Sequence, residues 1–321
     1  MLVYLLRRLV PAALVVVLLS FLGFWVFASR IDPLAPLKMQ TPYPKERIAR
    51  ISKRAHLDDS IPVRYWIWVK GIATGSDAGH TIVEDEPIWP PVWYSLKRSL
   101  QLVAATMIVV IAASIAIGTM SARRAGSGLD VTLRGFSYFA WSVPVFLLAV
   151  IFQQLVFRTE GWTGRELLPP NGWASGTGLA YTESWVKHMA LPVLTLAATY
   201  VGAHSRYVRS SVAGALVAPY SVVARAKGLP ERTVTRRALR TALIPFVTVV
   251  ALDFGGLLGA SFAVDWIFRL QGMGTLWVSA VAGYDPYQLE AVLVVTAVVV
   301  VAFSLLADLA LGWLDPRIRL T

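Results

Sequence analysis

The 321-residue chain contains no cysteine, and this absence excludes disulfides, thiolate metal sites, iron–sulfur clusters and cysteine nucleophiles. Acidic residues are also scarce, since 19 of them stand against 30 basic residues and leave a net charge of +11. Only 15% of the residues are charged and 56% are hydrophobic, whereas soluble domains average about 25% charged. This composition excludes a disordered chain and indicates that lipid surrounds much of the protein.

Six runs almost free of charged residues are candidates for membrane spans, because a spanning helix needs about 20 predominantly apolar residues. Their continuous apolar character favours helices over the alternating strands of a membrane barrel. The two shortest runs are expected to extend into flanking polar positions. We therefore predict an all-α membrane protein with six transmembrane helices. The runs are Leu9 to Ser29, Ser99 to Ala122, Gly135 to Phe157, Met189 to Ser205, Thr241 to Val264 and Ala291 to Ala307.

The loops between these runs differ in charge, and short cytoplasmic loops usually carry an excess of Lys and Arg. Residues 206–240 hold seven arginines and Lys227 against the single acid Glu231, and residues 123–134 are also basic. Both loops, and with them both termini, are predicted to face the cytoplasm. We divide the chain into residues 1–98, an N-terminal helix with a long external loop, and residues 99–321, a five-helix core with a cytoplasmic loop at about 206–240.

Several kinds of chemistry are not indicated by the sequence. The phosphate-binding pattern Gly-x-x-x-x-Gly-Lys-Ser/Thr does not occur, so we do not expect the chain to bind ATP itself. The four histidines lack metal-binding spacing, and we predict no metal, no cofactor and no catalytic residue. Ser261 lacks the second glycine and the nearby base of a serine hydrolase and is interpreted as a packing residue. The basic residues follow the loops and do not form a module that binds nucleic acid.

The cytoplasmic stretch from residue 218 to residue 231 has the pattern of a helix, a stop and a second helix. Pro219 suits a first helical position, Gly228 suits the left-handed residue after a helix end, and Pro230 can open the next helix. An apolar ridge on the first helix fits a groove in a partner protein, and it fits a helix lying on anionic lipid headgroups equally well. The ridge residues are Val222, Ala226 and Leu229.

Asp253 lies near the middle of the fifth run, where a carboxylate costs about 2.5 to 3.5 kcal/mol on insertion scales. It is therefore not expected to face lipid. Gly256 and Ala260 fall near its face of the helix and are assigned with it to a polar translocation path. Gly255 and Gly259 form a Gly-x-x-x-Gly pair on the opposite face and are assigned to helix packing. A structural hydrogen bond from Asp253 to a neighbouring helix remains the alternative.

Pro144 interrupts the third run. A proline inside a helix leaves a backbone carbonyl unpaired and bends the helix, and such a bend could serve as a gate. Ser142 and Pro144 are therefore assigned to the path or gate, although a static kink is the commoner explanation of such a proline.

The stretch Ala224-Arg-Ala-Lys-Gly-Leu229, followed by Arg237-Ala-Leu-Arg-Thr-Ala-Leu-Ile-Pro245, resembles the signature loop of permease subunits in binding-protein-dependent ABC importers. The resemblance is closest to the first permease of the oligopeptide and dipeptide branch and covers most of the chain. Val222 and Val223 depart from it, because the wider superfamily has glutamate and alanine there. Further matches are Leu5-Leu-Arg-Arg8, Ser142-Val-Pro144 and the ending Leu314-Asp-Pro-Arg-Ile-Arg319.

The resemblance implies the architecture of a type I ABC importer in the inner membrane of a bacterial cell, and a function in peptide uptake. It implies four kinds of protein partner or cargo: a second homologous permease, two cytoplasmic ATPase subunits, an external binding protein and the peptide. The residues that it assigns to ATPase coupling are Tyr220, Ala224, Arg225, Ala226, Lys227, Gly228 and Leu229.

Three alternatives remain beside this hypothesis. The cargo of the same class of importer could be nickel, haem or glutathione. A secondary transporter driven by an ion gradient would need no ATPase, but it should show several membrane-buried acids, and only Asp253 lies deep in a run. An intramembrane hydrolase would have to use Ser261.

Overall fold

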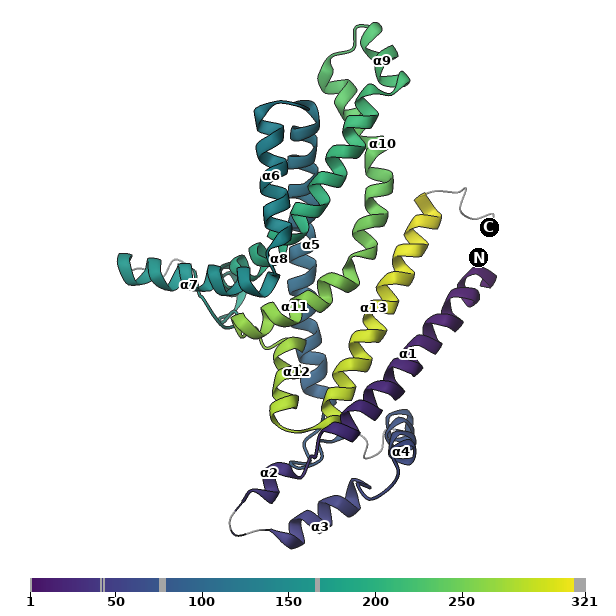
Figure 1. The fold of residues 1–321 in the computed structure, drawn as a ribbon, viewed down its shortest axis with the longest axis vertical. Coiled ribbons are helices and arrows are strands. Elements are labelled where there is room, and N and C mark those ends of the chain that lie inside the picture. Colours follow the sequence, from purple (N-terminus) through teal and green to yellow (C-terminus); the bar gives the residue numbers. More distant parts are fainter. Residues whose placement is uncertain (1, 41, 43, 75–78, 165–167, 315–321) are drawn as a thin grey trace. The chain divides into compact units, whose positions relative to one another are not determined.

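The computed structural model describes residues 2–40, 42, 44–74, 79–164 and 168–314, and their regular structure is helical apart from an isolated β-bridge between His80 and Pro87 (Figure 1). The predicted all-α class is confirmed. The terminal motif from Asp315 to Arg319 lies outside these ranges. The helices are α1 (Leu2–Arg30), α2 (Ala35–Lys38), α3 (Lys45–Arg54), α4 (Ile61–Thr74), α5 (Trp89–Arg123), α6 (Gly128–Ser142), α7 (Val145–Thr163), α8 (Gly178–Val217), α9 (Pro219–Ala226), α10 (Glu231–Leu252), α11 (Phe254–Phe268), α12 (Met273–Ala282) and α13 (Pro286–Leu314).

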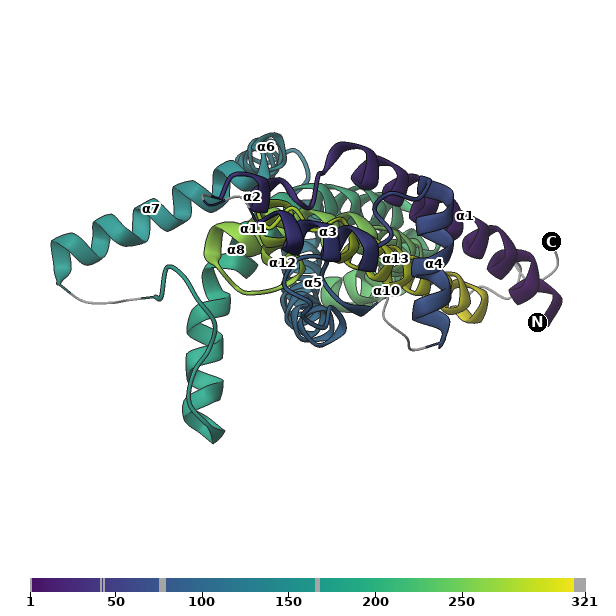
Figure 2. The same ribbon diagram turned by 90° about the horizontal axis from the view of Figure 1, so that it is seen from below.

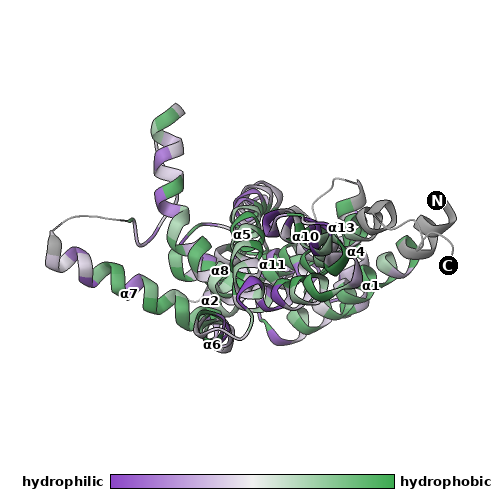
Figure 3. Ribbon diagram, turned by 90° about the horizontal axis from the view of Figure 1, so that it is seen from above, coloured by the Kyte–Doolittle hydropathy of each residue, from purple (hydrophilic) through white to green (hydrophobic). Residues whose placement is uncertain are grey.

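Within the described ranges, four segments are long and apolar enough to cross a membrane, or five if a bent pair of helices counts as one span. The single segments are α7 without its last residue, α5, the N-terminal segment Leu9–Lys38 and the α13 segment Pro286–Ala307. The bent pair is α10 with α11. Figure 3 shows the hydrophobic colour along much of α1 and α7. The predicted fourth span lies inside α8, which is long but not among the apolar segments.

The chain forms two compact units. The first comprises residues 1–98 and 271–302, and the second comprises residues 99–270 and 303–321. In the first unit, Phe24 of α1 stacks on Tyr287 of α13 and packs against Tyr65 of α4. In the second unit, α8 is the central helix, because it packs against α6, α7, α9, α10 and α11. Figure 2 shows α7 and the first turns of α8 projecting away from α5 and α6.

The third predicted span is wrong as a single helix, because the chain breaks at Pro144. Helix α6 ends at Ser142, Val143 is extended, and α7 begins at Val145. A proline lacks the backbone N–H of a helical bond, and its ring forces the preceding residue out of the helical region. The expected kink is therefore a complete interruption.

The long loop predicted from residue 30 to residue 98 is partly helical. It contains α2, α3 and α4, and its last ten residues already belong to α5, which begins at Trp89. Gly272 is the N-cap of the short helix α12, and the two residues after it are helical. The segment from residue 30 to residue 98 therefore carries three short helices before α5 begins.

Candidate functional site

The helix, stop and helix predicted for residues 218–231 are confirmed. Helix α9 begins at Pro219 and ends at Ala226, and Gly228 adopts a φ of +76°. An L-residue with a side chain is strained at this φ, so the sharp turn depends on glycine. Pro230 is the N-cap of α10 and Glu231 its first residue, one position later than expected. Local sequence signals therefore determine this corner of the molecule.

One face of α9 is packed against the rest of the chain. Ala224 is buried in an apolar cluster that includes Leu216 of α8 and Val234 of α10. The hydroxyl of Ser221, also buried, donates to the carbonyl of Ala215 at 2.7 Å. Leu229 is half-buried against the same cluster. These contacts fix α9 against the end of α8 and the start of α10.

The opposite face of α9 is apolar and exposed. Tyr220, Val222 and Val223 are about half exposed, at 46%, 55% and 52%. Ala226 and Lys227 are exposed beside them. We call Tyr220, Val222, Val223, Ala226 and Lys227 the outer face of α9. Of the coupling residues predicted from the sequence, Tyr220, Ala226 and Lys227 belong to this face.

Arg225, predicted as a coupling residue, is used inside the chain. Its Nη1 donates to the carbonyl of Leu216 at 2.8 Å, and its Nε donates to Glu231 Oε1 at 2.6 Å. The guanidinium thus joins the end of α8 to the start of α10 and spans the base of α9. Hydrogen bonds between charged partners are stronger than neutral ones. Arg225 is therefore a strut that fixes the orientation of the outer face.

Asp253 lies at the break between α10 and α11, which are bent by 49°. Its Oδ2 is 3.1 Å from Nε2 of His204 on α8, in a contact that lacks the alignment of a hydrogen bond. The side chain of His204 is 1% exposed and that of Asp253 is 44% exposed. Asp253 therefore presents part of its carboxylate away from α8, where the described chain provides no other cation within ion-pair distance.

The Nδ1 nitrogen of His204 is already engaged in a hydrogen bond within α8. Nδ1 lies 2.8 Å from the carbonyl of Tyr200, and a carbonyl only accepts, so Nδ1 carries a hydrogen. The imidazole also packs against Phe246 of α10, with ring centroids 5.8 Å apart. With Nδ1 so used, the contact to Asp253 is made by Nε2, the second nitrogen of the same ring.

The small residues after Asp253 have different surroundings. A Cβ on Gly256 would lie 3.4 Å from the hydroxyl of Tyr200, so the path face approaches α8 closely. A Cβ on Gly259 would meet no described atom within 4 Å, and Gly255 and Ala260 are half-buried. The packing partner predicted for Gly259 is thus not found within the described chain. Ser261 is buried and donates to the carbonyl of Leu258 at 2.7 Å, which agrees with its interpretation as a packing residue.

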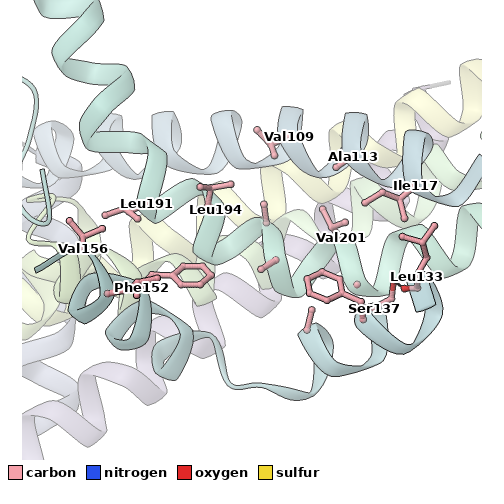
Figure 4. A pocket seen from close by; sticks show the side chains of 16 residues that line it. Val109, Ala113, Ile117, Leu133, Ser137, Phe152, Val156, Leu191, Leu194 and Val201 are labelled. Atoms are coloured by element: carbon pink, nitrogen blue, oxygen red, sulfur yellow. Dashed lines mark hydrogen bonds between the residues drawn. The ribbon is translucent and has the colours of Figure 1, made fainter. Parts of the chain in front are cut away.

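An open cavity of about 360 Å³ lies beside the break at Pro144, between α5, α6, α7 and α8 (Figure 4). Its lining includes Phe136, Phe152 and Leu194, and Ser137 is its polar lining residue. Ser137 shares a hydrogen bond of 3.1 Å with Ser205 of α8. A charged solute would lose hydration here without compensation, so this cavity does not suit a zwitterionic cargo. Ser142, at the end of α6, is exposed and donates to the carbonyl of Tyr138 at 2.7 Å.

A buried ionic cluster at the start of α6 was not identified by the sequence analysis. Asp130, fully buried in the first turn of α6, receives two hydrogen bonds of 2.7 Å from Nε and Nη2 of Arg209 on α8. Ser121, near the end of α5, and the N–H of Gly126 also donate to it. The hydrogen bonds from Arg209, followed by those from Ser121 and Gly126, hold the pKa of Asp130 well below its usual value. We call these four residues the Asp130 clamp.

Part of this cluster had a sequence signal. Ser127 and Asp130 have the spacing of a helix N-cap, and Ser127 does accept from the N–H of Asp130. That pattern explains the start of α6 but gives no indication of Arg209, which is 79 residues away. His204 carried no signal either, since a single histidine among apolar residues has no distinctive spacing. Both partners are defined by the packing of α8.

Comparisons with known proteins extend over the whole chain. Residues 114–320 match the family model described as the inner membrane component of binding-protein-dependent transport systems. Residues 1–116 match the model of the N-terminal part of such membrane components. The two matches together cover the described helices from α1 to α13.

Three curated relatives illustrate the similarity. A probable peptide ABC transporter permease protein, y4tP of Sinorhizobium fredii, is 30% identical over 323 residues, which are 99% of both chains. The oligopeptide transport system permease protein OppB of Haemophilus influenzae is 26% identical over 99% of this chain and 100% of its own. The dipeptide transport system permease protein DppB of Alkalihalophilus pseudofirmus is 30% identical over 85% of this chain and 86% of its own.

Proposed function

Because the chain belongs to the family of binding-protein-dependent transport system inner membrane components, we propose that it is the permease subunit of an ATP-driven peptide importer. It is a multi-pass protein of the inner membrane. Peptide is the proposed cargo because full-length relatives are named as permeases for peptides, oligopeptides and dipeptides. The observation that carries the mechanism is the outer face of α9, an exposed apolar surface on a rigid corner.

We propose six membrane spans with both termini in the cytoplasm. The spans lie within α1, α5, α6 with α7, α8, α10 with α11, and α13, and the first turns of α6 up to residue 134 belong to the cytoplasmic side. Support comes from the basic residues of 123–134, where α5 ends and α6 begins, and from those around α9, since Lys and Arg concentrate on the cytoplasmic side. Helix α8 counts as a span because its 40 residues exceed the length needed to cross a bilayer.

The partners follow from this topology. Two cytoplasmic ATPase subunits dock on this permease and on a second, homologous one, and an external binding protein delivers the peptide. Here the ATPase contacts the outer face of α9. The gap beside Gly259, where a Cβ meets no described atom, suits a close approach of the second permease. The partly exposed carboxylate of Asp253 faces the path between the permeases, because it would be costly against lipid.

Helix α8 carries the motion of α9 into the membrane. It is directly followed by α9, and Arg225 fixes the angle between α9, α8 and α10. Farther along α8, Arg209 holds the corner between α5 and α6 through Asp130, and His204 touches Asp253 at the bend. An ATPase can shift the permease between two states only if it contacts them unequally, and α8 connects that contact to both places.

The test is the exchange of Gly228 for valine in the reconstituted complex. Valine is strained at φ +76°, so the corner that presents α9 should distort, and ATP-driven peptide uptake should be lost while the protein remains inserted. Gly214→Val is the matched control, because Gly214 is also open to solvent but has ordinary helical geometry. Normal uptake by Gly228→Val would remove the coupling role of this loop.

A second experiment separates an ABC importer from an ion-driven transporter. The purified chain with its permease partner, placed in vesicles with an ion gradient and no ATPase, should not accumulate labelled trialanine. Accumulation there would replace the proposed mechanism by secondary transport.

A further inference from the structure

The short helix α3 has an unusual charge for a segment on the proposed external side. Its ten residues include five basic residues and the single acid Glu46. Translocated loops longer than about 60 residues do not have to avoid Lys and Arg, but they have no reason to collect them either. The concentration on one helix therefore calls for a local explanation. The basic residues are Lys45, Arg47, Arg50, Lys53 and Arg54.

Helix α3 is held rigidly in its unit. Ile51 is buried together with Leu34, Leu37, Ala55 and Ile82. The loop that supplies Ile82 is tied to the start of α13, because Asp285 Oδ2 accepts the N–H of Ile82 at 2.7 Å. The hydroxyl of Tyr287 donates to the carbonyl of Ala55 at 3.0 Å, just after α3. The basic residues thus project from a fixed support.

Three of the arginines line one groove of about 370 Å³. Arg47, Arg50 and Arg54 follow each other along one side of α3, and Ile51 and Val83 complete the lining. Arg54 is fixed by a 2.6 Å contact of its Nη1 with Asp85 and by a 2.6 Å hydrogen bond of its Nη2 to the carbonyl of Ile82. Arg47 and Arg50 are exposed and have no acidic partner within 4 Å in the described chain.

We propose that this groove binds carboxylate groups on an acidic surface of the external binding protein and so docks it on the permease. The forked guanidinium matches a carboxylate with two parallel hydrogen bonds, and two such forks stand free in the groove. The proposal rests on the proposed function and topology, which put α3 on the side where the binding protein arrives. The segment between α1 and α5, which contains α3, would thus serve as the docking site for the binding protein.

Charge around the groove favours a protein over a lipid surface. Glu84, Asp85 and Glu86 are exposed directly after the groove residue Val83, and Asp85 pairs with Arg54 of the groove. An anionic membrane would attract the arginines and repel these acids, whereas a protein surface can match both signs. Figure 1 draws α2 and α3 beyond the C-terminal end of α1, within their own unit.

The test uses two double charge reversals on the same helix. Arg47→Glu with Arg50→Glu changes the groove, and Lys45→Glu with Lys53→Glu changes the same net charge outside it. Peptide-dependent ATPase activity of the reconstituted complex is measured against the concentration of binding protein. For the groove variant, the half-saturating concentration should rise about tenfold with an unchanged maximal rate, and the control should shift by less than about threefold.

The outcomes distinguish the possibilities. Equal shifts in both variants would mean that diffuse charge and not the groove attracts the partner, and would overturn the proposal. An unchanged half-saturating concentration, together with weaker binding of the groove variant to vesicles containing phosphatidylglycerol, would assign the groove to lipid and overturn it as well. If the wild-type complex needed no binding protein, the proposed function would fail and the docking partner with it.

Discussion

Two acids of other helices lie close to basic side chains of α8 in the described chain, Asp130 at Arg209 and Asp253 at His204, and the two contacts differ in geometry and in burial. Arg209 meets Asp130 with two aligned hydrogen bonds of 2.7 Å, and Asp130 is fully buried with further donors around it. His204 meets Asp253 with one unaligned contact of 3.1 Å, and nearly half of the Asp253 side chain is exposed. The first contact joins α8 to a helix corner, and the second joins it to a helix break.

The difference shows where the second unit is stiff and where it can change. A buried, fully hydrogen-bonded ion pair is lost only at a high cost, because either partner left alone keeps its charge in the interior. A partly exposed pair contributes little and can be exchanged for water. We therefore expect the Asp130 clamp to move as one body with α8, and the contact at Asp253 to open and close during transport.

The largest effect should come from Arg209→Ala. The change removes both aligned hydrogen bonds from the buried Asp130 carboxylate and leaves Arg134, at 3.5 Å, as its nearest cation. Removal of one partner from a buried pair costs about 3 to 5 kcal/mol. The melting temperature of the purified chain should fall strongly, and little protein should reach the membrane. A melting temperature close to that of the wild type would mean that Ser121, Gly126 and Arg134 satisfy Asp130 without Arg209.

A paired replacement sharpens this result. Asp130→Leu combined with Arg209→Met should be more stable than Arg209→Ala, because it removes both buried charges and fills similar space. If the double variant recovers stability but transports poorly, the clamp is needed for its geometry. If it is as unstable as Arg209→Ala, packing and not charge explains the loss.

Asp253→Asn should have a smaller effect on stability. A partly exposed pair is worth about 1 kcal/mol or less, so abundance and melting temperature should remain close to those of the wild type. Peptide uptake should nevertheless fall, because the amide removes the carboxylate charge from the proposed path. His204→Gln is the companion variant. A collapse of abundance in Asp253→Asn would show that the residue is structural.

The smallest effect should be the change in the stability of the chain with pH between pH 8 and about pH 5. The pKa of Asp130 is lowered by folding, so its contribution to stability is present above about pH 4, the usual pKa of an aspartate, and is lost only as the pH falls toward the folded-state pKa. The difference in melting temperature between wild type and Asp130→Asn should be constant from pH 8 to about pH 5. A marked decrease between pH 7 and pH 6 would contradict this assignment.

The sequence predicted those parts of the molecule that depend on local signals. Pro219 and Gly228 marked the limits of α9 because each has a conformation of its own, and the all-α class followed from continuous apolar runs. The break at Asp253 was not predicted, since the proline of this run, Pro245, lies inside α10 and no proline or other helix stop stands at Asp253. The pairing of Arg209 with Asp130 was also out of reach, because it joins residues 79 positions apart.

Which side chains of the 218–231 loop remain exposed was only partly predictable for the same reason. Spacing along α9 identified Val222 and Ala226 as apolar, and both are exposed. It gave no indication that Arg225 points back to Leu216 and Glu231, because those contacts depend on how α8 and α10 meet. Periodicity identifies a face, but tertiary packing decides which side chains remain free for a partner.

The most direct test of the account is a pair of distance measurements by pulsed electron paramagnetic resonance. The chain has no native cysteine, so spin labels can be placed at will in this subunit. One pair, Arg124→Cys with Gly214→Cys, reports on the corner held by the Asp130 clamp, and the other, Gly214→Cys with Leu252→Cys, reports on the bend. All three positions are exposed.

On binding of a non-hydrolysable ATP analogue to the reconstituted complex, the distance between positions 124 and 214 should stay the same. The distance between positions 214 and 252 should change. Equal changes in both pairs, or a change at the clamp alone, would contradict the claim that α8 and the α5–α6 corner move as one body against a flexible bend.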